Sequence, residues 1–154
     1  MGEHSMPGYM THIAAGGLVT GGALYVAQVT DTFQAEPVTY AALVAIGMLA
    51  GLFPDVDTDS RGQRLYYALL LIVDLGLMIH EEYRWAAILG FLAMIPAIDN
   101  HRGWTHTWWA MLVVPLPILA LPMTFYDYGW EPLLPFYLAA VLGYCSHLLL
   151  DNIT

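Results

Sequence analysis

The sequence predicts an all-α membrane protein, a polytopic bundle of about six helical spans. Of its 154 residues, 58% are hydrophobic and only 11% are charged, and the mean hydropathy is +0.59. A soluble domain seldom has this composition. Six apolar segments, which we expect to be helices, are separated by polar or proline-containing stretches. They run over residues Ile13–Val29, Val38–Phe53, Leu65–Ile79, Trp85–Ile98, Thr107–Phe125 and Leu133–Leu150.

The lengths of these segments vary around the length that a membrane crossing needs. A helix needs about 20 apolar residues to cross the hydrocarbon core, and several segments are shorter. The third and fourth are the weakest predictions, since they could be tilted, extended through their polar ends or partly interfacial. Neither a Ser/Gly/Pro-rich linker nor an internal repeat divides the chain. We therefore expect residues 1–154 to form a single membrane-embedded domain.

Glycines, prolines and short polar runs indicate how the segments pack and end. The first segment carries small residues about one turn apart, which allow another helix backbone to approach closely. These are Gly16, Gly17, Gly21 and Gly22. Pro54 and a run of acids end the second segment, and HEEYR joins the third and fourth in a tight hairpin. Pro115, Pro117 and Pro122 should kink the fifth segment, because each removes a backbone donor.

The charge balance is strongly acidic. Thirteen acids, four arginines and no lysine give a formal net charge of −9. Binding of nucleic acid is disfavoured, because phosphate contacts need a basic patch. Such self-repulsion is tolerated best at high salt, which favours a halophilic protein, although an acidic surface alone is a comparable interpretation. Cys145 is the only cysteine, so neither an intramolecular disulfide nor a thiolate metal cluster is available.

Six crossings would place most of the histidines and aspartates on one face of the membrane. The residues on this face are His12, Asp55, Asp57, His101, His106, His147 and Asp151. Arg61, Arg64 and Arg102 lie on the same face, against Arg84 alone on the other. The positive-inside tendency therefore predicts that this face, with both termini, is cytoplasmic.

The strongest local pattern is S-H-L-L-L-D, which ends the sixth segment. Positions four apart share a helix face, so the His147 ring and the Asp151 carboxylate can converge on a single ion. An ordinary intrahelical hydrogen bond is an equally good interpretation of this pair alone. Polar groups within spans nevertheless indicate function more often than not.

The segment H-R-G-W-T-H holds a second group of candidates. His101 and His106 would diverge on a continuous helix, so their convergence requires a turn. Gly103 can provide this turn, and Thr105 can cap a helix that begins near His106. Arg102 could clamp a substrate phosphate or stabilise developing negative charge. Alternatively, these histidines are solvated loop residues.

The remaining candidate metal ligands are Asp55, Asp57 and His12. Carboxylates two apart in an extended segment point the same way, so Asp55 and Asp57 could bind one ion together or bridge two. Acid runs in loops are usually solvated, however, and a lone histidine at the end of a span is more often a hydrogen-bonded interface residue. The co-location of all four groups makes a shared metal site geometrically available.

Four stretches, MTHIAAGG, LFPDVDTDS, HRGWTHT and GYCSHLLLDNIT, resemble the family of LexA-binding, inner-membrane-associated metal-dependent hydrolases. That family is grouped with the zinc-dependent phospholipase C and P1 nuclease enzymes, and the resemblance implies a helical core like theirs. It also implies metal-binding roles for His12, Asp55, Asp57, His101, His106, His147 and Asp151. Members usually continue beyond the D-x-x-T stretch, whereas this chain stops at Thr154, which leaves open a missing C-terminal element.

These observations lead us to expect a membrane-bound hydrolase that holds about one to three divalent ions, zinc being the default. The ion would lower the pKa of a bound water to about 7, Asp55 would take the proton, and Arg102 would act on the substrate. Phosphoesters are favoured because the related soluble enzymes cleave them. A site at the level of the headgroups suggests membrane lipid as a partner and a lipid or lipid-linked substrate.

Two other functions remain open from the sequence. A divalent-metal transporter or sensor could use the same ligands transiently. Transport predicts polar groups that continue through the bilayer, and Asp74 is the only clear candidate within the segments. A structural membrane subunit is the third interpretation, in which the histidines and aspartates only cap helices.

Overall fold

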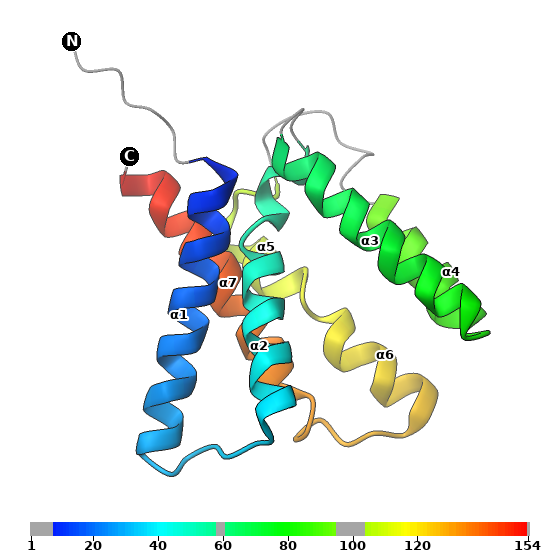
Figure 1. The fold of residues 1–154 in the computed structure, drawn as a ribbon, viewed down its shortest axis with the longest axis horizontal. Helices are drawn as coiled ribbons and strands as arrows, with labels where there is room; N and C mark the ends of the chain where they lie inside the picture. The colour runs from blue at the N-terminus through cyan, green and yellow to red at the C-terminus, as the bar shows by residue number, and fades with distance from the viewer. Residues whose placement is uncertain (1–7, 58–60, 95–103, 154) are drawn as a thin grey trace.

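The computed structural model describes residues 8–57, 61–94 and 104–153, and within these ranges it contains helices and no strand (Figure 1). The prediction of an all-α bundle is confirmed. The elements are α1 (Tyr9–Val29), α2 (Pro37–Ala50), the 3₁₀ helix η1 (Phe53–Asp57), α3 (Arg61–Ile79), α4 (Tyr83–Met94), α5 (Trp108–Val113), α6 (Pro117–Tyr126) and α7 (Leu134–Ile153).

Four helical stretches of the described chain are long and apolar enough to cross a membrane. They are Tyr9–Val29, Arg61–Ile79, Trp108–Tyr126 and Leu134–Asn152. The third predicted segment is thus a full-length helix of 19 residues, because its polar first turn extends it. In contrast, α2 has only 14 residues, which is short for a crossing, and α4 has 12 residues within the described part of the chain, which ends at Met94 there. All six predicted segments are helical where the structure describes them, and the second is shorter than a typical span.

Pro115 and Pro117 interrupt the fifth segment as predicted, whereas Pro122 lies inside α6. α5 ends at Val113, α6 begins at Pro117, and Pro115 lies in the break between them. A proline has no amide hydrogen, so the regular ladder of helix hydrogen bonds cannot continue through this point. The break divides the segment into two short helices.

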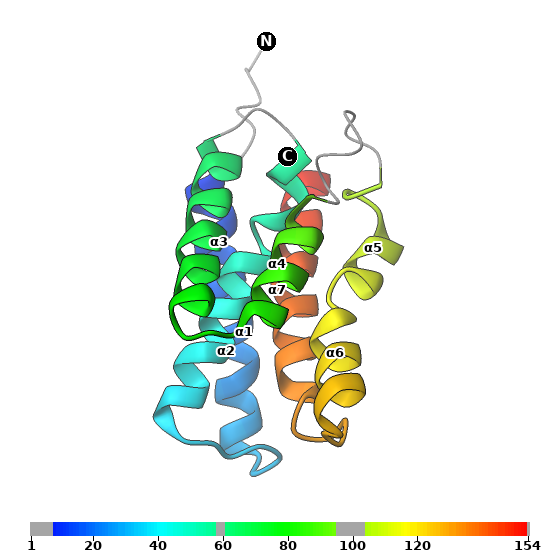
Figure 2. The same ribbon diagram turned by 90° about the vertical axis from the view of Figure 1, so that its right-hand side faces the viewer.

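Three helices, α1, α2 and α7, pack closely against one another (Figures 1 and 2). A Cβ atom on Gly16 of α1 or on Gly143 of α7 would collide with the carbonyl oxygen of Gly47 in α2. Gly47 itself is covered by the side chain of Thr20. Of the four glycines predicted to pack in the first segment, Gly16 makes the closest contact. Backbone contact of this kind needs residues without side chains at the seam.

α3 and α4 form an antiparallel hairpin beside this core (Figure 1). The Tyr67 hydroxyl donates a hydrogen bond to the Ala93 carbonyl and so links the two helices. The connection is the tight turn predicted from HEEYR, and Glu81 adopts a φ of 63° there. At this end of the hairpin Trp85 stacks on Tyr126 of α6 and donates to its hydroxyl.

One end of the bundle brings together the segments that carry the predicted ligands. The start of α1, η1, the start of α5 and the end of α7 all lie at this end, which is at the top of Figure 2. The start of α3, with Arg61 and Arg64, is there too, whereas α4, whose second residue is Arg84, begins at the far end of the hairpin. The fold therefore places chemistry-bearing residues from distant parts of the sequence side by side.

Candidate metal centre

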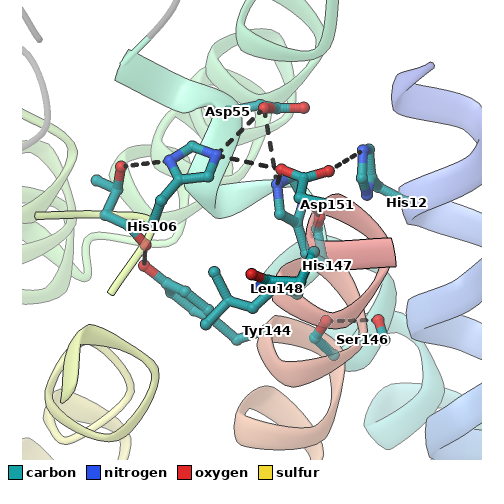
Figure 3. Close-up of polar contacts among 12 residues, drawn as sticks. His12, Asp55, His106, Tyr144, Ser146, His147, Leu148 and Asp151 are labelled. Carbon is teal, nitrogen blue, oxygen red and sulfur yellow. Dashed lines mark hydrogen bonds and ion pairs between the residues drawn. The ribbon is translucent and has the colours of Figure 1, made fainter. Parts of the chain in front are cut away.

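Four described side chains offer ligand atoms that all lie within 4.8 Å of one another. They are Asp55 of η1, His106 before α5, and His147 and Asp151 of α7 (Figure 3). The set combines two imidazoles with two carboxylates, a donor combination that suits zinc and other first-row divalent ions. We call these four residues the cluster.

The distances within the cluster match those around a single ion. His147 Nε2 lies 3.1 Å from Asp151 Oδ2 and 3.7 Å from Asp55 Oδ1. His106 Nε2 lies 3.5 and 3.9 Å from the same two oxygens. Ligand atoms about 2.0–2.2 Å from a tetrahedral metal are roughly 3.4 Å from one another. The four N···O distances bracket this value, so the cluster has room for one ion.

The orientation of His147 is fixed by the backbone of α2. The imidazole is fully buried, and its Nδ1 lies 2.8 Å from the Gly51 carbonyl oxygen. A carbonyl only accepts hydrogen bonds, so Nδ1 carries the hydrogen and Nε2 is left with a lone pair. Within the described chain, Nε2 has no hydrogen-bond partner, and it faces two carboxylates. A buried lone pair against two anionic oxygens is unfavourable unless a cation or a proton lies between them.

The carbonyl of Gly51 is free to accept a hydrogen bond from His147 because Gly51 caps the C-terminus of α2. The last carbonyls of a helix have no partner within the helix, and Gly51 follows the final residue of α2. A Cβ atom at Gly51 would lie only 2.8 Å from the carbonyl oxygen of His12, so a larger residue does not fit without a shift. His147 Nδ1 therefore donates a hydrogen bond to a carbonyl that has no partner within the helix, while Nε2 faces the two carboxylates of the cluster.

Asp55 is positioned by a 3₁₀ turn and not by an extended segment. Leu52 and Val56 are buried on one side of this turn, and Asp55 is only partly exposed on the other. Residues two apart do not point the same way in a 3₁₀ helix, which has three residues per turn. The predicted pairing of Asp55 with Asp57 through extended geometry is therefore wrong. Asp57 ends η1, but its side chain lies outside the described part of the structure.

His106 lies in the turn before α5, held by its neighbour Thr105. The Thr105 hydroxyl lies 3.2 Å from His106 Nδ1, and the Thr105 carbonyl accepts a hydrogen bond from Tyr144 of α7. α5 begins at Trp108, and its N-cap is Thr107, so the prediction that Thr105 caps this helix is wrong. Thr105 is fully buried and contacts the His106 ring.

His12 lies beside the cluster and contacts it through Asp151. Its ring stacks on that of His147 with 3.8 Å between centroids. His12 Nε2 is 3.5 Å from Asp151 Oδ1, whereas Asp151 Oδ2 faces His106 and His147. Asp151 thus presents one oxygen to His12 and the other to the pair of imidazoles. His12 is almost completely buried, and its Nδ1 has no hydrogen-bond partner among the described residues.

Two of the predicted site residues, His101 and Arg102, lie outside the described residues. Their roles, like that of the Asp57 side chain, stay predictions. Gly51 and Tyr144 position the cluster but were not predicted to do so. Tyr144 precedes His147 by three residues on the same helix, and this spacing was the one signal in the sequence for its proximity.

The family model described as the YdjM inner membrane protein matches residues 6–154 of this chain. The expectation of an inner-membrane family is confirmed by this match, and with the four apolar helices it identifies a membrane protein. No curated protein and no solved structure matches the chain. The relationship to the phospholipase C and P1 nuclease group therefore stays a prediction.

Proposed function

The chain belongs to the YdjM inner membrane protein family, and we propose that it is a membrane-bound metal-dependent hydrolase. The observation that carries this proposal is the buried Nε2 of His147. That atom faces Asp55 and Asp151 while Nδ1 is held by the Gly51 carbonyl. A histidine oriented by a backbone carbonyl on one nitrogen is the usual arrangement of a metal ligand.

His106, His147 and Asp151 would hold the ion, with Asp55 as the fourth ligand or as the base. A bound divalent ion supplies a water molecule acidic enough to attack at neutral pH and polarises the bond to be cleaved. The Asp55 side chain is about one quarter exposed, at 24%, so it can exchange a proton with water. Zinc is the default ion for two imidazoles and two carboxylates. Arg102 would stabilise charge on the substrate, as the sequence led us to expect.

The favoured reaction is hydrolysis of a phosphoester at the surface of the inner membrane. A phosphate oxygen is a hard anionic ligand, so it would be attracted to a divalent ion in the cluster. Arg61 and Arg64 begin α3 at the end of the bundle that carries the cluster. By the positive-inside tendency this end, with both termini, would face the cytoplasm.

A divalent-metal transporter or sensor is the second candidate, because ligands alone do not imply catalysis. Transport needs a row of polar groups across the membrane. Asp74 in α3 lies in a cavity of about 330 Å³ that is otherwise lined by Tyr67 and apolar residues. This lining supplies no succession of ligands, which favours the enzyme. A structural subunit, the third candidate, would not bind metal at all.

Elemental analysis of detergent-purified protein tests the metal site. We expect stoichiometric metal in the wild type and its loss in His147→Ala and His106→Ala. His80→Ala is the matched control, because His80 is exposed in the turn that follows α3, at the end of the hairpin away from the cluster. A His147→Ala variant that keeps the wild-type metal content would refute the site, and a metal-free wild type would favour the structural subunit.

Hydrolysis of bis(p-nitrophenyl) phosphate then separates the enzyme from the transporter. We expect release of p-nitrophenol by the wild type and by His80→Ala, and none by His147→Ala. A protein that binds metal through the cluster but hydrolyses no phosphodiester would favour the transporter or sensor.

A further inference from the structure

An apolar cavity of about 500 Å³ lies between the three-helix core and the hairpin of α3 and α4. It is bounded by η1 and by the six helices from α2 to α7, and its lining is almost entirely aliphatic and aromatic. Representative lining residues are Ile46, Leu70, Leu92, Ile118 and Ala140. Its size is within the range of about 300–1,000 Å³ found for small-molecule pockets.

The cavity extends to the residues that hold the cluster. Three aromatic residues of the lining come two or three positions before a cluster residue. They are Phe53 before Asp55, Trp104 before His106, and Tyr144 before His147. The Tyr144 ring lines the cavity, while its hydroxyl donates to the carbonyl of Thr105, next to His106 (Figure 3). One residue therefore borders both the apolar cavity and the polar cluster.

The surroundings of the cavity determine what can occupy it. Four of the helices that line it, α3, α5, α6 and α7, belong to stretches apolar enough to cross a membrane, so we expect its walls to lie at the depth of hydrocarbon. Water is a poor occupant there, because the lining offers few hydrogen-bond partners. The cluster lies at one end of the cavity, and a dication bound there would attract an anionic group. A molecule with an anionic head joined to a hydrocarbon chain is therefore complementary to both the cluster and the cavity.

We propose that this cavity holds the hydrocarbon chain of a lipid substrate whose phosphoester lies at the cluster. The inference rests on the proposed hydrolase function and specifies its substrate class. Binding energy from the chain would orient the phosphoester, because contacts remote from the reacting bond also position that bond. The enzyme would then prefer a long-chain phosphodiester to a short one that carries the same leaving group.

Two substrates that differ only in chain length test this preference. Methyl p-nitrophenyl phosphate and hexadecyl p-nitrophenyl phosphate release the same product. In mixed micelles we expect kcat/KM to be at least about tenfold higher for the hexadecyl ester. Equal values for the two esters would overturn the inference and leave the hydrolase function intact. Hydrolysis of neither ester would instead count against the proposed function.

Filling the cavity should remove the preference. Ala93→Trp adds a large side chain to the cavity wall, and we expect the ratio of hexadecyl to methyl kcat/KM to fall at least about tenfold. Ala87→Trp is the matched control, because Ala87 is an exposed alanine of the same helix outside the lining. A ratio in Ala93→Trp equal to that in Ala87→Trp would contradict the proposal.

A binding measurement tests the cavity independently of catalysis and of the folding of Ala93→Trp. Wild-type protein is irradiated with a photoactivatable hexadecyl phosphonate, and the modified residues are mapped by mass spectrometry. We expect adducts on Leu70, Leu92 and Ile118, and their loss on competition with hexadecyl phosphate. Adducts restricted to exposed residues that line neither cavity, such as Ile72 and Ile79, would overturn the proposal. So would crosslinks through the cavity to a second copy of the chain.

Discussion

His147 satisfies a backbone acceptor with one nitrogen and turns the other toward two carboxylates. Gly51, which it contacts, is 96 residues away in sequence, so the contact that orients this ring depends on how α2 packs against α7. Asp151 is on the same helix as His147, but it also reaches the rings of His12 and His106. Asp151 therefore lies against the imidazoles of three residues, His12, His106 and His147.

Asp151→Asn should weaken metal binding at least about tenfold, because it removes the negative charge that faces the imidazoles. Competition with a chromophoric chelator measures the affinity. Asp127→Asn is the control, since Asp127 is an exposed residue directly after α6 with a φ of 51°, which asparagine tolerates. Equal affinity in Asp151→Asn and wild type would exclude Asp151 as a ligand.

Thr105 is a positioning residue for His106. We expect its hydroxyl to affect metal affinity indirectly, by orienting the imidazole of His106. Thr105→Val keeps the shape of the side chain but removes the oxygen near His106 Nδ1, and it should lower metal affinity about 10–100-fold. Thr105→Ser should restore the affinity. Thr124→Val, at an exposed threonine of α6, is the control. A serine variant as weak as the valine variant would contradict the role of the hydroxyl.

The seam of glycines between α1, α2 and α7 determines whether the cluster can form. Gly16, Gly47 and Gly143 bring the three backbones into contact, and Gly51 follows at the end of α2. His12 is one helical turn before Gly16, and His147 is one turn after Gly143. Close packing of the backbones therefore sets the positions of the imidazoles at the end of the bundle.

Gly143→Ala should destabilise the protein by about 1–3 kcal/mol, because its methyl group would collide with the Gly47 carbonyl. Gly76→Ala is the matched control, since nothing lies within 4 Å of a Cβ atom at Gly76 in α3. That substitution should stabilise its helix by about 0.5–1 kcal/mol. Thermal unfolding in detergent compares the two variants. A Gly143→Ala variant at least as stable as Gly76→Ala would refute the account of the seam.

The sequence predicted the helices better than it predicted the turns between them. Apolar runs and prolines locate every helix, because burial in lipid or protein selects apolar residues over whole segments. The predicted second segment ran to Phe53, whereas α2 ends at Ala50. The 3₁₀ turn that holds Asp55 forms because Leu52 and Val56 are buried against the core, which is a tertiary effect. The cap of α5 was misplaced by two residues, from Thr105 to Thr107, since either threonine satisfies the local rule.

The sequence predicted which segments of the chain meet at the candidate site, but not the distances between their side chains. The crossing pattern placed His12, Asp55, His106, His147 and Asp151 at one end, and the structure places them there. The stacking of His12 on His147 depends on how closely α1 approaches α7, which no local pattern encodes. The same holds for the apolar cavity, whose walls come from six α-helices and η1.

The whole molecule combines a strongly negative charge with a surface that is largely apolar. The net charge of −9 is spread over the polar connections, where like charges repel one another. At 0.1 M ionic strength salt largely screens the repulsion between exposed charges that are more than about 10 Å apart. The unfolding temperature in a non-ionic detergent should therefore rise as KCl is added. Sucrose at the same osmolality is the control. The electrostatic explanation would be contradicted if sucrose raised the unfolding temperature as much as KCl does, or if KCl did not raise it.

X-ray absorption spectroscopy of the zinc-loaded, detergent-purified protein tests most directly whether the cluster is one metal site. We predict only nitrogen and oxygen ligands at about 2.0–2.2 Å, with the outer scattering of two imidazoles. His147→Ala should retain the scattering of at most one imidazole, and His80→Ala should match the wild type. A wild-type spectrum without imidazole scattering, or one that His147→Ala leaves unchanged, would contradict the account.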